Sequence, residues 1–148
     1  MITLSDARQV IAAAETKAHE IGQPMNIAVV DAGGNLVSHV RMDGAWIGSI
    51  DISINKAFTA RAFDLETAQL AENSQPGQQF FGIHASNHGR VMIFAGGIPL
   101  RRGGSFIGGS GEQRRAGSDG RHRRRRSVLE LSACLRSVRH EKAPIAHE

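Results

Sequence analysis

Apolar residues recur at intervals of three and four over residues 3–21. The stripe consists of Leu4, Ala7, Val10, Ile11, Ala14, Ala18 and Ile21. This spacing places the apolar side chains on one side of a helix, so it predicts an amphipathic helix that packs on a core. Thr3 or Ser5 can cap its start, and Gly22 and Pro24 are typical of its end.

The apolar pattern then changes from helical spacing to strand length. Residues 25–32 form an apolar run with β-branched members, and residues 36–42 form a second strand-length segment. Between them lie Gly33, Gly34 and Asn35, which are typical turn residues because glycine adopts positive φ without steric cost. The two segments are therefore expected to form an antiparallel hairpin.

The rest of the pattern predicts two more helices and a second set of strands. Residues 49–63 read as a helix capped by Ser49, with Ile50, Ile54, Ala57, Phe58 and Arg61 on one face. Residues 65–72 read as a shorter helix capped by Asp64. Strands are expected at residues 80–83, 91–95, 98–101 and 105–108, with a turn at Gly96 and Gly97.

Adjacent strands with helices grouped apart are typical of the α+β class. We expect one antiparallel sheet of about five strands with the helices packed on it. The expected domain covers residues 1–113, followed by an irregular basic tail over residues 114–148. The tail pattern allows a short helix over residues 127–138.

Charge separates the domain from the tail. Residues 1–100 carry six Lys or Arg and nine Asp or Glu, whereas residues 101–148 carry twelve and five. The net charge of +4 therefore reflects the tail. No apolar run approaches the ~20 residues that a membrane span needs, and the start lacks the pattern of a signal peptide. With a single cysteine, Cys134, we expect a cytoplasmic protein.

Candidate site residues are few, and each has a structural alternative. His19 lies on the first helix beside its apolar stripe, and His39 lies in mid-strand on the same face as Val37 and Arg41 by a period of two. His84 and His88 are four apart, but Gly82 and Gly89 around them favour a loop. A lone histidine is more often structural or solvated than a ligand.

Three further residues could bind an anion. Lys56 is either a surface lysine whose stem covers apolar surface or a partner for a carboxylate or propionate. Asn87 and Arg90, beside Gly89, could donate hydrogen bonds to an anion at the mouth of a loop. No spacing of a nucleophile and a base indicates acyl transfer or thiol chemistry.

A series of sequence blocks resembles the GlcG/HbpS-like haem-binding family, which includes the C-terminal domain of PduO-type cobalamin adenosyltransferases. The blocks are residues 26–37, 41–45, 56–60, 86–90 and 96–100. The resemblance implies a haem- or tetrapyrrole-binding accessory or sensor protein of small-molecule catabolism that assembles as a homo-oligomer. It makes haem the candidate cofactor, with His19 as the first choice of iron ligand and His39 as the second. Lys56 and Arg90 would then be candidates for the propionates, with Asn87 beside Arg90.

Two other function classes stay open. The chain could be a small catabolic enzyme that acts on a hydroxy acid or a related carboxylate, with Lys56, Arg90 and Asn87 as anion holders and His84 or His88 as acid and base. It could also be a ligand-free interaction module. The sequence has no C-x-x-C-H motif, so any haem would be bound non-covalently.

The resemblance covers residues 4 to about 113, but the sequence departs from the family pattern after about Gly108. Family members continue their last strand in the form I-G-A-I-G-V-S-G-G-S-G-E-Q, whereas Ile107 and Gly108 here run directly into Gly-Ser-Gly-Glu-Gln. We therefore expect a shortened last strand with an exposed edge. One extra base in codons for Asp-Glu-Gln would read Arg-Arg-Ala, as at residues 114–116, so we favour a frameshift over a nucleic-acid-binding tail. The lack of aromatic residues after Phe106 also argues against nucleic acid as a partner.

Overall fold

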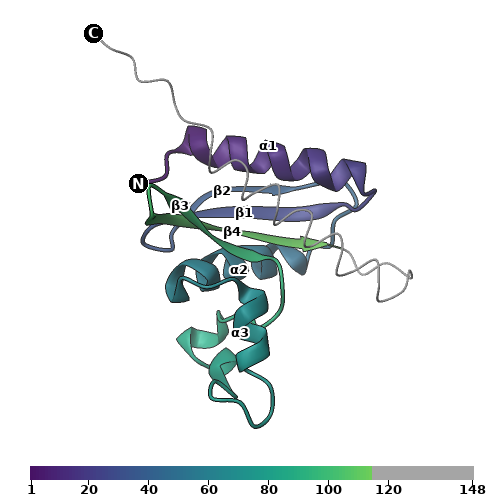
Figure 1. Cartoon of the computed structure of the whole chain (residues 1–148). Coiled ribbons are helices and arrows are strands. Elements are labelled where there is room, and N and C mark those ends of the chain that lie inside the picture. Colours follow the sequence, from purple (N-terminus) through teal and green to yellow (C-terminus); the bar gives the residue numbers. More distant parts are fainter. Residues whose placement is uncertain (115–148) are drawn as a thin grey trace.

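A four-stranded antiparallel sheet forms the middle layer of the protein, with helices on both faces (Figure 1). The structure is a computed structural model that describes residues 1–114. The strand order is β2-β1-β4-β3, α1 covers one face, and α2 covers the other. The elements are α1 (Leu4–Glu20), β1 (Met25–Asp31), β2 (Leu36–Arg41), α2 (Ser49–Phe63), α3 (Thr67–Asn73), η1 (Ile83–Ala85), η2 (Asn87–Gly89), β3 (Gly97–Arg102) and β4 (Ser105–Arg114).

The predicted α+β class is confirmed, with four strands in the described residues where about five were expected. No helix among residues 1–114 is long and apolar enough to cross a bilayer. The predicted domain boundary at residue 113 stays a prediction, and the tail with its short helix over residues 127–138 lies outside the described residues.

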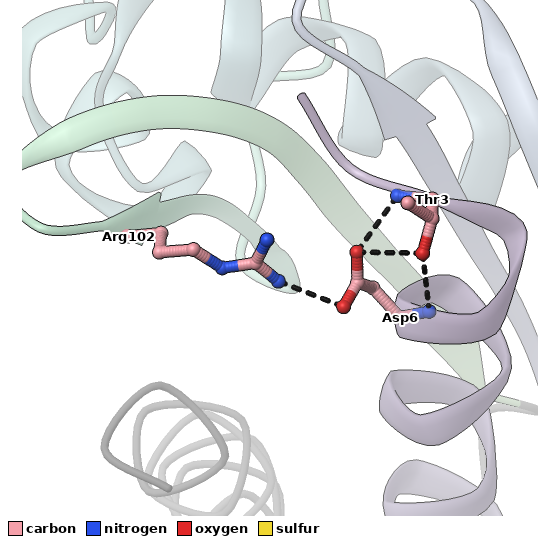
Figure 2. Close-up of polar contacts among 3 residues, drawn as sticks. All are labelled: Thr3, Asp6 and Arg102. Carbon is pink, nitrogen blue, oxygen red and sulfur yellow. Dashed lines mark hydrogen bonds and ion pairs between the residues drawn. The ribbon is translucent and has the colours of Figure 1, made fainter. Parts of the chain in front are cut away.

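The start of α1 is fixed by its own cap and by a contact from the sheet (Figure 2). The Asp6 main-chain N–H donates to Thr3 Oγ1 at 3.1 Å, and the Thr3 main-chain N–H donates to Asp6 Oδ2 at 2.8 Å. Arg102 Nη2, at the end of β3, donates to Asp6 Oδ1 at 2.7 Å. This capping box satisfies main-chain N–H groups that have no partner within the helix. Thr3 is therefore the N-cap of the helix predicted over residues 3–21.

A β-bulge separates the two ends of β2. Val29 pairs with Ser38 and Val30 pairs with Leu36, so Val37 is the extra residue. Val37 packs against the α1-side core, whereas His39 pairs with Ala28, which belongs to the cluster facing α2. The expectation that Val37 and His39 share a face is wrong, because the bulge breaks the period of two.

The last strand is longer than expected and lies inside the sheet. β4 pairs with β1 over Met25–Asp31 and with β3 on its other side, so the edges are β2 and β3. The expected end at residue 108 and the exposed edge are therefore wrong. The sequence after Gly108 still forms a strand because the register with β1 continues to Arg114.

The contact between α2 and β4 is made by small residues. A side-chain carbon at Gly111 would lie 2.5 Å from the main-chain nitrogen of Ala57, and Gly109 lies against the same helix. α2 buries Ser53, Lys56, Ala57 and Ala60. Of the expected face, Ala57 is buried and Ile54 packs against its cluster, whereas Ile50, Phe58 and Arg61 are only partly buried. Gly48, not Ser49, occupies its N-cap position.

The segment between α2 and β3 contains no strand. The expected strand at residues 80–83 forms turns that lead into η1, and the expected strand at residues 91–95 is irregular. α3 starts at Thr67 after Glu66 as N-cap, while Asp64 ends α2 in the left-handed conformation at φ 54°. Asp64 therefore acts at the C-terminus of α2 and not at the start of α3.

Candidate functional site

A groove between the C-terminal end of α1 and β2 is the candidate binding site. It is open to solvent and has a volume of about 590 Å³, within the range of small-molecule sites. Its walls combine apolar and polar side chains. They are Glu15, Ala18, His19, Gly22, Gln23, Pro24, Val40, Arg41, Met42 and Asp43.

His19 is the imidazole at this groove. It lies in the last turn of α1 and is exposed. A position near a helix C-terminus suits an imidazole because the unpaired carbonyl groups there carry partial negative charge. Neutral imidazole nitrogen is also a common ligand of haem iron. His19 can therefore offer a metal ligand to a molecule bound in the groove.

His39 lies on the other face of the sheet from His19. Val40, its neighbour in β2, lines the groove, and successive side chains of a strand point to opposite faces. His39 is half-buried, and its Nε2 is enclosed without a hydrogen-bond partner in the described part of the chain. Burial lowers the pKa of the imidazole and favours its neutral form. Within one chain, His19 and His39 cannot both ligate a metal ion bound in this groove.

Lys56 is a buried residue and not a surface lysine. Its side chain is 2% exposed, and its Nζ donates to three acceptors: Ala95 O at 2.6 Å, Glu112 O at 3.0 Å and Gln113 Oε1 at 2.6 Å. The ammonium also lies 4.4 Å from the centre of the Phe94 ring. These contacts satisfy a buried charge and join α2 to β4 and to the segment before β3.

Arg90 and Asn87 lie beside α2, away from the groove. The Arg90 guanidinium stacks 3.8 Å from the centre of the Phe58 ring, and its Nε donates to Asn55 Oδ1 at 3.3 Å. Asn87 is exposed and has a left-handed backbone, as does His88. His84 is exposed in the neighbouring turn. These residues form a separate polar surface on the α2 side of the protein.

The structure therefore divides the five predicted site residues between two places. His19 lines the groove, while His39, Lys56, Asn87 and Arg90 lie on the α2 side of the sheet. Sequence reasoning did not identify Arg41 and Asp43 as groove residues. Both lie in a block that carried the resemblance, but only the packing of α1 beside β2 shows which groove they line.

The family described as haem degrading protein HbpS-like matches residues 2–112 of the chain. The chain belongs to this HbpS-like family. A 15.0 kDa protein from the dhaT-dhaS intergenic region of Citrobacter freundii is 42% identical over 110 residues, which is 74% of this chain and 78% of the relative. The corrinoid adenosyltransferase PduO of Salmonella typhimurium is 34% identical over 110 residues, but these cover only 33% of PduO.

Solved structures of HbpS-like proteins share the fold. The Klebsiella pneumoniae protein ORFY superimposes with a TM-score of 0.84 at 34% identity, covering 96% of this chain and 92% of ORFY. The haem complex of PduOC superimposes with a TM-score of 0.81 at 27% identity, covering 93% of this chain and 94% of PduOC.

In this HbpS-like chain the described groove wall comes entirely from residues 15–43, within the part that matches the family. It lies outside the sequence that departs after Gly108. No cluster of three His, Cys, Asp or Glu side chains able to hold a metal ion occurs in the described part of the chain. Among the groove residues, His19 is the one imidazole.

Proposed function

We propose that the chain binds haem non-covalently in the groove between α1 and β2, with His19 as the axial iron ligand. The observation that carries the proposal is an exposed imidazole on the wall of an open cavity of about 590 Å³. Ala18, Pro24, Val40 and Met42 supply apolar surface for the flat macrocycle. Membership of the HbpS-like family and the haem complex of PduOC support the choice of ligand.

The groove also changes our choice of propionate partner. Arg41 is among the residues around the groove, but its side chain alternates with that of Val40, and its Nη1 donates to Ala45 O at 3.2 Å. Arginine suits carboxylates because its planar donors match their geometry. Lys56 and Arg90 could reach a propionate only at a second site on the α2 side. We therefore propose Arg41 as the first propionate partner, which requires its guanidinium to leave Ala45 O and turn towards the groove.

Titration with hemin tests this proposal. The wild-type chain is expected to shift the Soret band with saturable binding, and His19→Ala is expected to lower affinity by ~10-fold or more and to change the spectrum of the bound haem. His39→Ala is the matched control, because it removes an imidazole from the opposite face. No Soret shift with the wild type, or equal loss in both variants, would refute binding at this groove.

A carboxylate-processing enzyme is the second candidate function. Its support is the run of three left-handed residues, Asn87, His88 and Gly89, directly before Arg90, because strained backbone is concentrated at functional sites. Lys56 is too buried to take part without an opening of the core. Turnover of a hydroxy acid that is lost in His84→Ala and His88→Ala, without a bound chromophore, would favour this function.

The proposal includes a physiological role for the chain. An accessory role in small-molecule catabolism is supported by the relatives from the dhaT-dhaS region and by PduO. We also propose a homo-oligomer, which a gel-filtration mass equal to one chain of 15.9 kDa would contradict.

A further inference from the structure

Glu112 is an ionisable side chain enclosed in the core between the sheet and α1. It is 6% exposed, and its Oε1 has no hydrogen-bond partner among residues 1–114. It pairs in register with Ile27, and directly opposed residues of antiparallel strands point to the same face. Ile27 belongs to the apolar cluster that includes Ala14 and Ala18 of α1. Glu112 therefore points into the contact between α1 and the sheet.

The same row of the sheet leads from Glu112 to the groove. Ile27 pairs with Glu112 on one side and with Val40 on the other, and Val40 lines the groove. The C-terminal half of α1 spans both places, because Ala18 packs on the core cluster and also lines the groove beside His19. A change in how this half of α1 sits on the sheet would therefore alter the groove.

The groups that face Glu112 give its carboxylate little support. Ser110, two residues earlier on the same face, also has a buried hydroxyl without a partner. The facing residues of α1, β1 and β3 are apolar: Ala7, Val10, Ile11, Ala14, Ala18, Met25, Ile27, Val29, Ile98 and Leu100. The charged residues of α1 (Asp6, Arg8, Glu15, Lys17, His19 and Glu20) and of β3 (Arg101 and Arg102) are outside this buried set.

Lys56 is the charged group that lowers the pKa of Glu112, and it lies on the other face of the sheet. Its ammonium donates to the main-chain oxygen of Glu112, and its charge favours the carboxylate. Burial has the larger effect and raises the pKa of Glu112 to about 8. Around neutral pH the closed structure therefore holds Glu112 mainly as the neutral acid.

We propose that Glu112 is a proton-dependent lock that holds the C-terminal half of α1 on the sheet and so couples the shape of the groove to pH. The neutral acid fits the apolar contact. The carboxylate is stable only where water reaches it, which requires this half of α1 to move away from β4. Between the ordinary pKa of a glutamate, near 4.5, and about 8, a rise in pH therefore favours the open arrangement.

Amide hydrogen exchange of the full-length chain tests the lock without any ligand. Protection of residues 14–20, corrected for the intrinsic effect of pH on exchange, is expected to fall by about tenfold per pH unit between pH 5.5 and 7.5. In Glu112→Gln the protection is expected to be independent of pH. Glu72→Gln, which removes an exposed carboxylate on α3, is the matched control and should behave as the wild type.

Amide exchange in β1 distinguishes local opening of α1 from unfolding of the whole protein. The lock predicts that amides of residues 14–20 exchange faster than those of residues 27–30 at every pH. Equal rates in both segments, or the same pH dependence in wild type and Glu112→Gln, would overturn it. If Glu112→Gln does not fold, Glu112→Val provides the second variant without a titrating group.

A direct titration needs no variant at all. The carboxyl carbon of Glu112, followed by NMR in the wild-type chain, is expected to titrate with a midpoint at a pH of about 8. A midpoint near 4.5 would refute the lock.

The effect on haem rests on the proposed function and can be separated from it. Hemin affinity is measured for wild type and Glu112→Gln at pH 5.5 and 7.5, and the ratio of the two affinities is compared, because pH effects that do not involve Glu112 are common to both proteins. The ratio is expected to move in favour of Glu112→Gln as the pH rises. If hemin does not bind at all, the proposed function fails, while the exchange and NMR results still decide the lock.

Discussion

β1 and β4 are neighbouring central strands, yet they are built from opposite kinds of residue. β1 buries six consecutive residues, of which Asn26 alone is polar. β4 buries mainly glycine, with Ser110 and Glu112 as its polar members. Both strands are covered on both faces, so burial alone does not determine the residues that a central strand can carry.

The difference shows two ways in which a central strand supports a core. The side chains of β1 fill the space under α1 and contribute by removing apolar surface from water. β4 contributes on its α2 side by leaving space, since Gly109 and Gly111 allow the helix backbone to approach. On its α1 side β4 places two polar groups into a core that β1 fills with Ile27 and Val29.

Gly111→Val should have the largest effect, because it fills the space that β4 leaves for α2. The added atoms would overlap the main chain of Ser53 and Ala57, which cannot move independently of the helix. We expect loss of more than ~3 kcal/mol of unfolding free energy and failure to give a cooperative urea transition. Gly48→Val is the control, since no atom lies within 4 Å of the added carbon and the φ is −63°. A Gly111→Val protein as stable as this control would refute the packing argument.

Ile27→Ala should have the next largest effect, because it removes volume from the strand that fills the core. Ile27 is fully buried within the cluster under α1. A loss of about 2–5 kcal/mol is expected from chemical denaturation. Leu36→Ala, at a side chain that is 50% exposed on the edge strand, should cost far less. Comparable losses in the two variants would contradict the role assigned to β1.

Glu112→Val should stabilise the protein by about 1–3 kcal/mol at pH 4, where Glu112 is mainly neutral in both states, because it replaces a buried polar group that lacks a partner among the described residues. The pKa of Glu112 is raised, to about 8, so the folded state retains a proton that the unfolded state releases above pH 4.5. Wild-type stability should therefore decrease by about 1.4 kcal/mol per pH unit between these values. The Val variant should lack this slope. Parallel pH profiles from urea titrations would show that Glu112 does not titrate as described.

Arg102→Ala should have the smallest effect, because the residue connects the β3–β4 hairpin to α1 only at the surface. Its ion pair with Asp6 has side-chain exposures of 58% and 26%. Such pairs contribute about 0.2–1 kcal/mol, and less at high salt. Thermal unfolding at low and high ionic strength measures this contribution. A larger loss that persists at high salt would mean that the contact does more than pair two surface charges.

The sequence predicted the parts of the fold that follow from local periodicity. The apolar stripe located α1, and the turn residues Gly33, Gly34 and Asn35 located the hairpin of β1 and β2. The bulge at Val37 was not predictable, because it depends on how β2 pairs with β1. The false strand at residues 91–95 had suitable β-branched and apolar residues, but its segment is held by contacts to Thr59 and Lys56 of α2.

The second half of β4 could not be predicted as a strand from its own residues. A Gly-Ser-Gly-Glu-Gln segment has low β-propensity, and only the neighbouring strands and α2 explain why it lies in the sheet. Ser110 and Glu112 place two polar side chains at buried positions of this strand.

The candidate site could be predicted only in part. The family resemblance made His19 the first choice of iron ligand, and the structure puts it on the groove wall. The other four predicted residues lie across the sheet, and residue spacing cannot reveal this because it depends on the order and register of the strands.

The buried ammonium of Lys56 allows opening of the core to be measured by chemical labelling. Residues 1–114 contain two lysines, and Lys17 has 25% of its side chain exposed while Lys56 has only 2% of its surface accessible. An amine-reactive reagent should therefore modify Lys17 and the N-terminus within its own reaction time. It should reach Lys56 only when α2 separates from β4. The mass of the peptide that contains residue 56 would then record the rate of that separation over time.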